Sequence, residues 1–447
     1  MTIQPSRAVD ATLAANQSRV LSAKRVFTGT TGTHLSDSSV VIVDGQIAWV
    51  GSTTGLPAEY AQLPVTDYGD ATILPGLIET HAHLASYTRV AQPDVTDPTF
   101  HDKSWETLSS VKIARQLASL GVTSVQSLGA AAYVDVALRE AINVGLIAGP
   151  RIVAAGPPVT LTGGHGWNSG GETDSIPEIL HQVREHHKAG ADVIKVMATG
   201  GFMSHSTCPW NAQFTTEEFK ALIDDAHRLG KRVASHAHGT QGIARVTEAG
   251  IDFIAHASFV DLDGQTRFDP RVADEIARKG IFTDSSSVPV YPEVDGPEGA
   301  PIVWRLYEHG VLLTPGHDIG AVYPASAYTF GLKQLEAAGL PRGEILVAAT
   351  SRAAAAIGYS GITGVLAPGF AADVIVATGD PLANLDALDS LQEVIIGGRT
   401  FDREYVAPFD PEVRLARDVA APGGPNDKRA DWIAKQQRVA EHPIVHV

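Results

Sequence analysis

Residues 74–84 read Leu74-Pro75-Gly76-Leu77-Ile78-Glu79-Thr80-His81-Ala82-His83-Leu84, and this stretch decides how the rest of the chain is interpreted. Pro75 and Gly76 interrupt an apolar run, which indicates a strand that leaves one layer of the fold and enters another. His81 and His83 follow at a spacing of two, and side chains two apart in an extended strand point to the same side. Both imidazoles can therefore reach one metal ion.

A close pair of histidines arises often by chance in a chain with 17 of them. Downstream, however, each of four more polar residues ends a short, strand-like apolar run: Lys195, His236, His256 and Asp318. The carboxyl ends of the strands of a parallel barrel share one rim, so residues placed there converge. The sequence therefore predicts a metal site on the rim of a barrel.

Strand-like and helix-like segments alternate through the middle of the chain, which is typical of an α/β fold with a parallel sheet covered by helices. Eight candidate strands predict a (β/α)8 TIM barrel. They are residues 72–80, 123–127, 151–155, 192–197, 232–235, 253–255, 281–283 and 311–314. A helix is expected over residues 215–229, with Thr216 as its N-cap.

Both ends of the chain carry β patterns, at residues 20–50 and again at 373–398. Asp44-Gly45 between two strand-like runs is a strong hairpin signal. We expect both ends to form one small β-sandwich domain, and the remaining segments divide around it. The expected parts are an arm (1–18), the β domain (19–72 and 365–407), the barrel (73–364) with a mouth loop (90–104), and a C-terminal extension (408–447) with a helix over 428–439.

Composition limits the partners and the location. The net charge of −16 argues against binding to nucleic acid or to an anionic membrane surface. No run of about 18 apolar residues is present, and the first twenty residues lack the apolar core of a signal peptide. Cys208 is the only cysteine, which fits a reducing compartment. We therefore expect a cytoplasmic protein with a small-molecule substrate, and expect it to be a homo-oligomer.

Lys195 lies in the almost wholly apolar run 191–197, where an ammonium without a partner is costly. Reaction of its amine with carbon dioxide would give an anionic carbamate whose two oxygens can bridge two metal ions. The alternatives are a lysine that extends to the rim or one that pairs with a carboxylate. The sequence alone does not choose among them.

The other rim residues also have ordinary alternatives. His236 and His256 are suitable metal ligands as neutral imidazoles, but each one alone could be a hydrogen-bonded core histidine. Asp318 can bind a metal and act as general base, or it can cap a helix.

Two histidines near glycine-rich loops are candidates for substrate contacts. His165, in a loop of three glycines, could polarise a scissile carbonyl or hold a substrate carboxylate. His238, two residues after His236, could face the substrate or support the ligands. Either could equally be an ordinary loop histidine.

The motifs occur in a fixed order: Pro75-Gly76-Leu77-Ile78 before His81-x-His83, then residues 194–201, His236-Ala237-His238-Gly239, Ile254-Ala255-His256 and Gly316-His317-Asp318. This highly specific set resembles the amidohydrolase superfamily, and more narrowly its imidazolonepropionase-like branch, which includes prolidase-type dipeptidases and amide or carbamate hydrolases. The resemblance covers about residues 19–400. His317 departs from it, because relatives usually carry a small or hydroxyl residue there, and this leaves open a histidine contact to substrate.

The resemblance implies a distorted (β/α)8 barrel with a composite β domain and a binuclear metal centre. In that centre His81 and His83 hold one ion, His236 and His256 hold the other, and carboxylated Lys195 bridges them. Asp318 would bind the first ion and move the proton. Two divalent ions are implied, with zinc as the first expectation, although such ligands also accept cobalt, manganese or iron.

The function expected from these residues is hydrolysis of an amide-like C–N bond in a peptide, an N-acyl amino acid, a carbamate or a related small molecule. The same fold can also carry a deaminase, an esterase or lactonase, or a phosphotriesterase. A non-enzymatic scaffold is a third alternative, and the presence of all six expected ligands argues against it.

Overall fold

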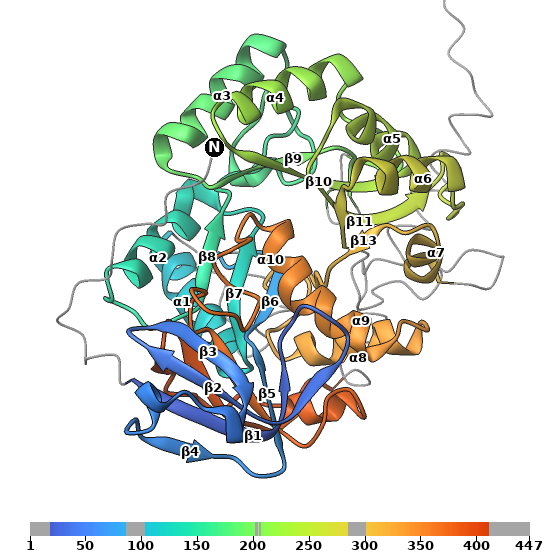
Figure 1. Cartoon of the computed structure of the whole chain (residues 1–447). Helices are drawn as coiled ribbons and strands as arrows, with labels where there is room; N and C mark the ends of the chain where they lie inside the picture. Colours follow the sequence, from blue (N-terminus) through green and yellow to red (C-terminus); the bar gives the residue numbers. More distant parts are fainter. Residues whose placement is uncertain (1–17, 86–102, 202–203, 205–206, 285–300, 411–447) are drawn as a thin grey trace, which may run out of the picture.

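The computed structural model describes residues 18–85, 103–201, 204, 207–284 and 301–410. Figure 1 shows a strand-rich domain below a larger part in which helices surround a parallel sheet. The arm (residues 1–17), most of the mouth loop and the extension from residue 411, with its expected helix, lie outside the described residues. Within the described part, no helix has both the length and the apolar character needed to cross a bilayer.

The eight predicted barrel strands are present and form two parallel sheets. One contains β6 (Leu77–Ala82), β7 (Val122–Ser127) and β8 (Arg151–Ala154). The other contains β9 (Val193–Met197), β10 (Arg232–Gly239), β11 (Phe253–Val260), β12 (Phe282–Thr283) and β13 (Leu312–Leu313).

The two sheets meet along both edges. At one seam Asp192 N donates to Ala154 O at 2.7 Å, and at the other Thr80 N donates to Pro315 O at 3.1 Å. Few hydrogen bonds join each seam, so the barrel closes but is distorted, as predicted. Every residue of β6, β7 and β9 is buried, as expected for parallel strands that are covered on both faces.

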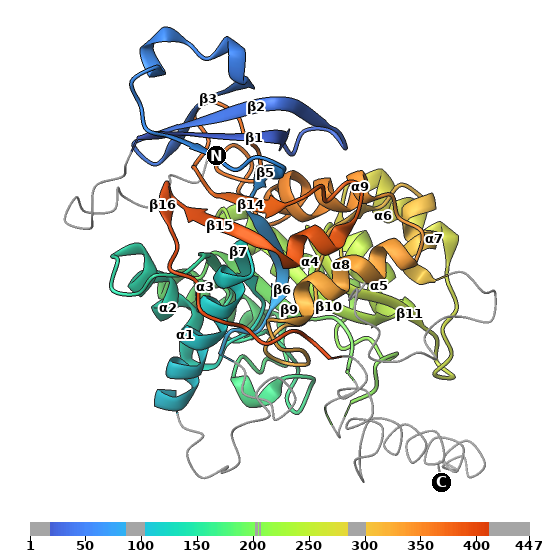
Figure 2. The same cartoon turned by 90° about the horizontal axis from the view of Figure 1, so that it is seen from below.

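Each barrel strand is followed by a helix, and Figures 1 and 2 show these helices around the strands. The helices are α1 (Lys103–Ser119), α2 (Val134–Asn143), α3 (Ile176–Ala189), α4 (Thr216–Arg228), α5 (Thr240–Ala249), α6 (Pro270–Lys279), α7 (Ile302–Glu308) and, after β13, α8 (Ala327–Ala337), α9 (Arg342–Val347) and α10 (Ala353–Ala356). The predicted cap of α4 is wrong by one residue. Thr215 is the N-cap, because its Oγ1 accepts from Glu218 N and Glu218 in turn accepts from Thr215 N.

The strand expected over residues 72–80 is in fact two strands. β5 (Ala71–Pro75) pairs in the β domain, whereas β6 pairs in the barrel. The change takes one residue: Gly76 N donates to Asp373 O, and Leu77 N donates to Gly121 O. A Cβ on Gly76 would lie 2.0 Å from Thr123 Oγ1, so only glycine fits. The change of domain thus falls at residue 76, not between 72 and 73.

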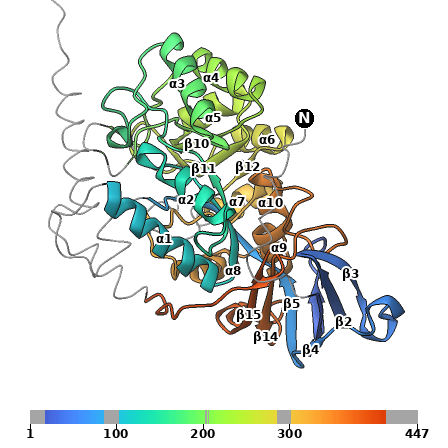
Figure 3. The same cartoon turned by 90° about the vertical axis from the view of Figure 1, so that its left-hand side faces the viewer.

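Strands from both chain ends build the β domain, and Figure 3 shows the blue and red strands side by side. They form one eight-stranded sheet in the order β16-β15-β14-β5-β1-β2-β3, with β4 paired to β1. The bounds are β1 (Arg19–Phe27), β2 (His34–Val43), β3 (Gln46–Ser52), β4 (Val65–Asp67), β14 (Val374–Thr378), β15 (Leu391–Ile396) and β16 (Arg399–Thr400). Ile47 N donates to Phe370 O, so this single sheet curls back on itself around an apolar core that includes Leu21 and Val374.

Candidate metal centre

The two histidines of the opening motif lie at the carboxyl end of β6 and face the same side. Their ring centroids are 5.3 Å apart. Both rings turn Nε2 toward one oxygen of Asp318, which lies 3.6 Å from His81 and 3.0 Å from His83. The spacing of two residues therefore has the predicted effect, because one carboxylate meets both imidazoles.

Asp318 lies in the loop after β13, with its backbone in the left-handed region at φ +57°. Few residues other than glycine adopt this conformation. Local hydrogen bonds hold it, because His83 N donates to Ile319 O at 2.6 Å and Val322 N donates to Asp318 O at 3.0 Å. Since α8 begins only at Ala327, Asp318 is not a helix N-cap.

The charge around Asp318 keeps its carboxylate ionised. Burial alone would raise its pKa, but His81, His83 and Lys195 outweigh burial and hold the pKa of Asp318 well below its usual value. An ionised carboxylate can bind a cation and accept a proton, which are the two roles expected of it.

His236 and His256 lie in the middle of β10 and β11, since both strands continue beyond the predicted ends, and their ring centroids are 4.6 Å apart. The ring of His256 is also 4.8 Å from that of His81, so the second pair joins the first. Burial holds the pKa of both His236 and His256 well below the usual value. Both rings are therefore neutral and offer a lone pair, as a metal ligand must.

The backbone of β11 is irregular where it delivers His256. His256, Ala257 and Phe259 have φ values of +73°, +45° and +52°, and the β10–β11 register shifts between Ala237 and Gly239. Positive φ at residues other than glycine is costly and gathers at functional sites. Here the irregularity begins at His256 itself, within the strand that carries this ring of the cluster.

His238 belongs to the same cluster. Its ring stacks on that of His256 at 4.4 Å, and its Nδ1 lies 2.9 Å from Ser258 Oγ. Burial lowers the pKa of His238 to about 3. Two sets of possible donors have ligand atoms within 4.8 Å of one another: His81, His256 and Asp318, and His236, His238 and His256.

Lys195 lies in the middle of β9 and only 1% of the residue is exposed, so its amine does not reach solvent. Its Nζ is buried and has no hydrogen-bond partner among the described residues. Burial lowers the pKa of Lys195 to about 8, against the opposing pull of Asp284 and Asp318. The unprotonated amine is therefore far more abundant near neutral pH than it is for an ordinary lysine.

His165 lies in the loop after β8, and its ring is 4.4 Å from that of His236. Its Nδ1 lies 2.8 Å from Ser204 Oγ, and its backbone N donates to Gln213 Oε1 at 2.9 Å. Burial lowers the pKa of His165 to about 4, so the ring is neutral. It borders the cluster without belonging to either set of donors.

These side chains fit divalent metal ions. The imidazoles of His236, His238 and His256 are neutral, the Asp318 carboxylate is ionised, and the buried Lys195 amine has no hydrogen-bond partner among the described residues. Nitrogen and oxygen donors of this kind suit zinc and similar ions.

Comparison with known proteins agrees with this site. The model of the Amidohydrolase family matches residues 72–401, which include every donor described above. The chain belongs to the amidohydrolase family. The resemblance inferred from the motifs is thus confirmed, and the enzyme is a hydrolase that acts on carbon–nitrogen bonds.

Three known proteins are similar to this amidohydrolase in sequence or in structure. Ochratoxinase from Aspergillus niger is 26% identical over 435 residues, which cover 86% of each chain. The crystal structure of a Xaa-Pro dipeptidase with bound methionine has a TM-score of 0.76 at 27% identity, and covers 86% of this chain and 99% of that one. Imidazolonepropionase from Paraburkholderia phymatum is 40% identical over 50 residues, which are 11% of this chain and 12% of that enzyme.

The structure of this amidohydrolase does not bring His317 into the cluster. The ring is fully buried, its Nδ1 donates to Glu79 Oε2 at 2.5 Å, and it packs 4.9 Å from the ring of Tyr328. A substrate contact for His317 would need an opening that this packing does not provide.

Sequence reasoning missed two buried carboxylates of the amidohydrolase centre. Asp284 Oδ2 lies 3.1 Å from His81 Nδ1, and Oδ1 accepts from His256 N at 3.0 Å. Glu79 Oε1 accepts from His81 N at 2.7 Å. Such partners fix the orientation of metal-binding rings. The position of Asp284, directly after the candidate strand 281–283, was a usable signal.

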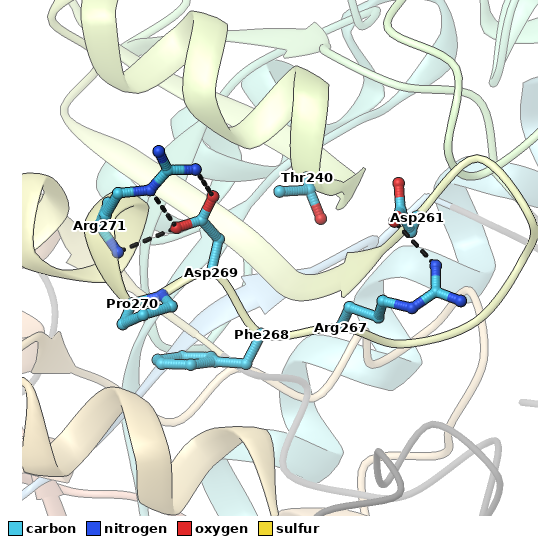
Figure 4. Close-up of a pocket in the computed structure, with 7 residues that line it drawn as sticks. All are labelled: Thr240, Asp261, Arg267, Phe268, Asp269, Pro270 and Arg271. Atoms are coloured by element: carbon cyan, nitrogen blue, oxygen red, sulfur yellow. Dashed lines mark hydrogen bonds and ion pairs between the residues drawn. The ribbon is translucent and has the colours of Figure 1, made fainter.

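A pocket of about 410 Å³ lies where β10 and β11, the strands of His236 and His256, end (Figure 4). It is lined by Thr240, just after β10, and by residues from the loop after β11 and the start of α6: Asp261, Arg267, Phe268, Asp269, Pro270 and Arg271. Arg267 pairs with Asp261 at 2.8 Å and Arg271 with Asp269 at 3.1 Å. Because its arginines are paired, the pocket is polar but carries little excess charge.

Proposed function

We propose that this amidohydrolase uses two divalent metal ions to hydrolyse an amide-like C–N bond of a small molecule, such as a peptide, an N-acyl amino acid or a carbamate. The observation that carries the proposal is the convergence, within one barrel, of the neutral imidazoles of His236 and His256 with His81, the ionised Asp318 and the buried Lys195 amine. Ochratoxinase and the Xaa-Pro dipeptidase, among its relatives, support this substrate class.

His81, His83 and Asp318 would hold one ion, and His236 and His256 the other. His256 contacts residues of both groups, and the ring of His238 stacks on it. Because His238 can place a ring nitrogen close to those of His236 and His256, it is a further possible donor to the second ion. Bound there, zinc would polarise the scissile carbonyl and lower the pKa of water. Cobalt, manganese and iron are the alternatives that such ligands accept.

Lys195 would bridge the two ions as a carbamate. The neutral amine attacks carbon dioxide, an N–C bond forms, and a proton leaves for solvent. The lowered pKa of Lys195 favours this reaction, because only the unprotonated amine is nucleophilic. The product is anionic, which removes the repulsion between an ammonium and two cations.

Asp318 would act as the proton carrier. Its ionised carboxylate accepts a proton from the attacking water and then delivers it to the departing nitrogen. The contact of His83 Nε2 with Asp318 Oδ1 at 3.0 Å, together with the fixed left-handed backbone, orients the carboxylate for both steps.

His165 would contact the substrate. When Ser204 donates to Nδ1, Nε2 carries the ring proton and can donate to the scissile carbonyl or to a substrate carboxylate. Its place at the edge of the donor cluster suits this role.

A substrate panel tests the proposed reaction. Dipeptides, N-acyl amino acids and carbamates should be hydrolysed more efficiently than lactones, phosphotriesters or aminopurines and aminopyrimidines. A clear preference for one of the latter three would overturn the amide-hydrolase proposal in favour of an esterase, phosphotriesterase or deaminase.

Removal of metal should abolish activity. Dialysis against a chelator is expected to remove turnover, and added Zn²⁺, Co²⁺ or Mn²⁺ should restore it, because the donors alone cannot polarise a carbonyl strongly. Metal analysis before and after dialysis gives the stoichiometry. Full activity in metal-free protein would contradict the mechanism.

His165→Ala should lower kcat/KM by roughly 10²- to 10³-fold, which is the usual effect of losing one donor to a developing oxyanion. The metal content should stay at two per chain, because His165 borders the donors without being one of them. Parallel metal analysis and kinetics check this. If the metal is lost as well, His165 is itself a ligand.

We further infer a small-molecule substrate, a cytoplasmic location and a homo-oligomer. The negative net charge and the single cysteine support the first two. Light scattering on the purified chain would measure the oligomeric state directly.

A further inference from the structure

Glu79 and His317 form a fully buried pair beneath the metal donors, and neither had a role in the proposed reaction. The Glu79 carboxylate accepts three N–H groups. Oε1 accepts from His81 N at 2.7 Å and from His317 N at 3.0 Å, and Oε2 accepts from His317 Nδ1 at 2.5 Å. Both side chains are 0% exposed.

The two bonds from His317 join the first barrel strand to the loop that carries Asp318, and the bond from His81 N fixes the same carboxylate within that strand. His81 is a donor on β6, and His317 is the residue directly before Asp318. The partner strand β13 has only two residues, so the ladder at this seam is short. Besides Glu79, the seam depends on Thr80, whose N and Oγ1 both donate to Pro315 O, and on His83 N, which donates to Ile319 O.

Helix α8 closes the other side of the pair. The ring of Tyr328 lies 4.9 Å from that of His317, and the Tyr328 hydroxyl donates to Ile78 O at 2.9 Å. A Cβ on Gly331 would lie 2.0 Å from His317 Nε2, so only a glycine lets the helix pack there. Water and substrate are therefore excluded from the pair.

We propose that Glu79 and His317 are positioning residues that set the separation of His81 and Asp318 and so determine the affinity of the site for metal. The inference rests on the proposed function. A buried carboxylate bonded to both sides of the seam fixes their register, and His81 Nε2 and Asp318 Oδ1 are only 3.6 Å apart across it. Without the pair, the loop before Asp318 would lose its side-chain link to Glu79 of β6, and the backbone hydrogen bond from His83 N to Ile319 O would be left to tie down the loop around Asp318.

Three variants test this role. Glu79→Gln turns an amide N–H toward N–H donors, and His317→Leu keeps bulk but removes the Nδ1 donor. Both should weaken Zn²⁺ binding by about 10- to 100-fold, the usual effect of losing a group that orients a ligand. His317→Asn should retain most of the affinity, because its side-chain N–H can replace Nδ1–H. Competition with a metal-binding dye measures the affinity.

The visible spectrum of the Co²⁺-loaded protein gives a second readout, since it reports ligand geometry. It should change in Glu79→Gln and His317→Leu and stay close to the parent spectrum in His317→Asn.

His186→Leu is the matched control, because His186 is also a buried histidine whose Nδ1 is hydrogen-bonded, to the Tyr133 hydroxyl at 2.8 Å. It should lower the melting temperature of the metal-free protein but leave the Zn²⁺ affinity unchanged. If Glu79→Gln and His317→Leu destabilise the metal-free protein as His186→Leu does and bind Zn²⁺ like the parent, the pair is merely structural and the inference is wrong. A parent protein that binds no metal would instead overturn the proposed function itself.

Discussion

Asp318→Asn is expected to lose nearly all turnover while keeping much of its metal. The amide retains an oxygen that can face His81 and His83 but cannot accept a proton from water. General acid–base catalysis contributes roughly 10²- to 10⁴-fold, and kcat should fall by that factor because the same group acts in both proton transfers. Single-turnover kinetics and metal analysis on one preparation measure the two effects separately.

Asp225→Asn makes the same change outside the site. Asp225 is a buried carboxylate of α4 that pairs with Arg184 at 3.0 Å. Its loss should reduce stability without affecting kcat. If Asp318→Asn instead turned over at close to the parent rate, another group would have to move the proton.

The local pattern of apolar residues was sufficient to predict the strands of the barrel, because these strands are covered on both faces. Runs such as Val193–Met197 must be apolar throughout, so a polar residue within one is conspicuous, and Lys195 is found at once. Pro75-Gly76 likewise marked the change of domain to within a few residues.

The residues that escaped prediction are those whose role depends on a partner far away in the chain. Asp284 reads as an ordinary polar residue after a strand, and only the closed barrel brings it within 3.1 Å of His81, 203 residues earlier. Glu79 and His317 are separated by 238 residues. His317 is a candidate substrate contact from the sequence because it departs from the residues that relatives usually carry before the aspartate, but the local sequence does not determine the direction in which its ring points.

Lys195→Ala is expected to lower metal content and activity together. Carboxylated Lys195 is the bridging donor of the proposed centre, and its loss should leave at most one ion bound with high affinity. Activity that requires both should fall with the second ion. Lys333→Ala is the control. Lys333 lies on α8 and pairs with Asp386 at 2.6 Å, outside the set of donors, so its loss should alter neither metal content nor activity.

A short carboxylic acid, such as acetate or propionate, should restore part of both metal content and activity in Lys195→Ala, since its two oxygens can occupy the vacated bridging position. It should have no such effect on Asp318→Asn, where the missing group must transfer a proton. Rescue confined to the lysine variant would separate a bridging role from a general loss of packing in β9.

The carbamate itself can be observed. Protein prepared with ¹³C-labelled bicarbonate should show a carbamate carbon by NMR, and crystals of the metal-loaded enzyme should show density beyond Lys195 Nζ. Carboxylation is expected because it reverses the sign of the charge on Lys195. An ammonium at this buried position would repel two divalent ions at short range, and carboxylation turns that repulsion into attraction. An unmodified Lys195 in fully metal-loaded, active enzyme would refute the bridge and require a mechanism with a single ion.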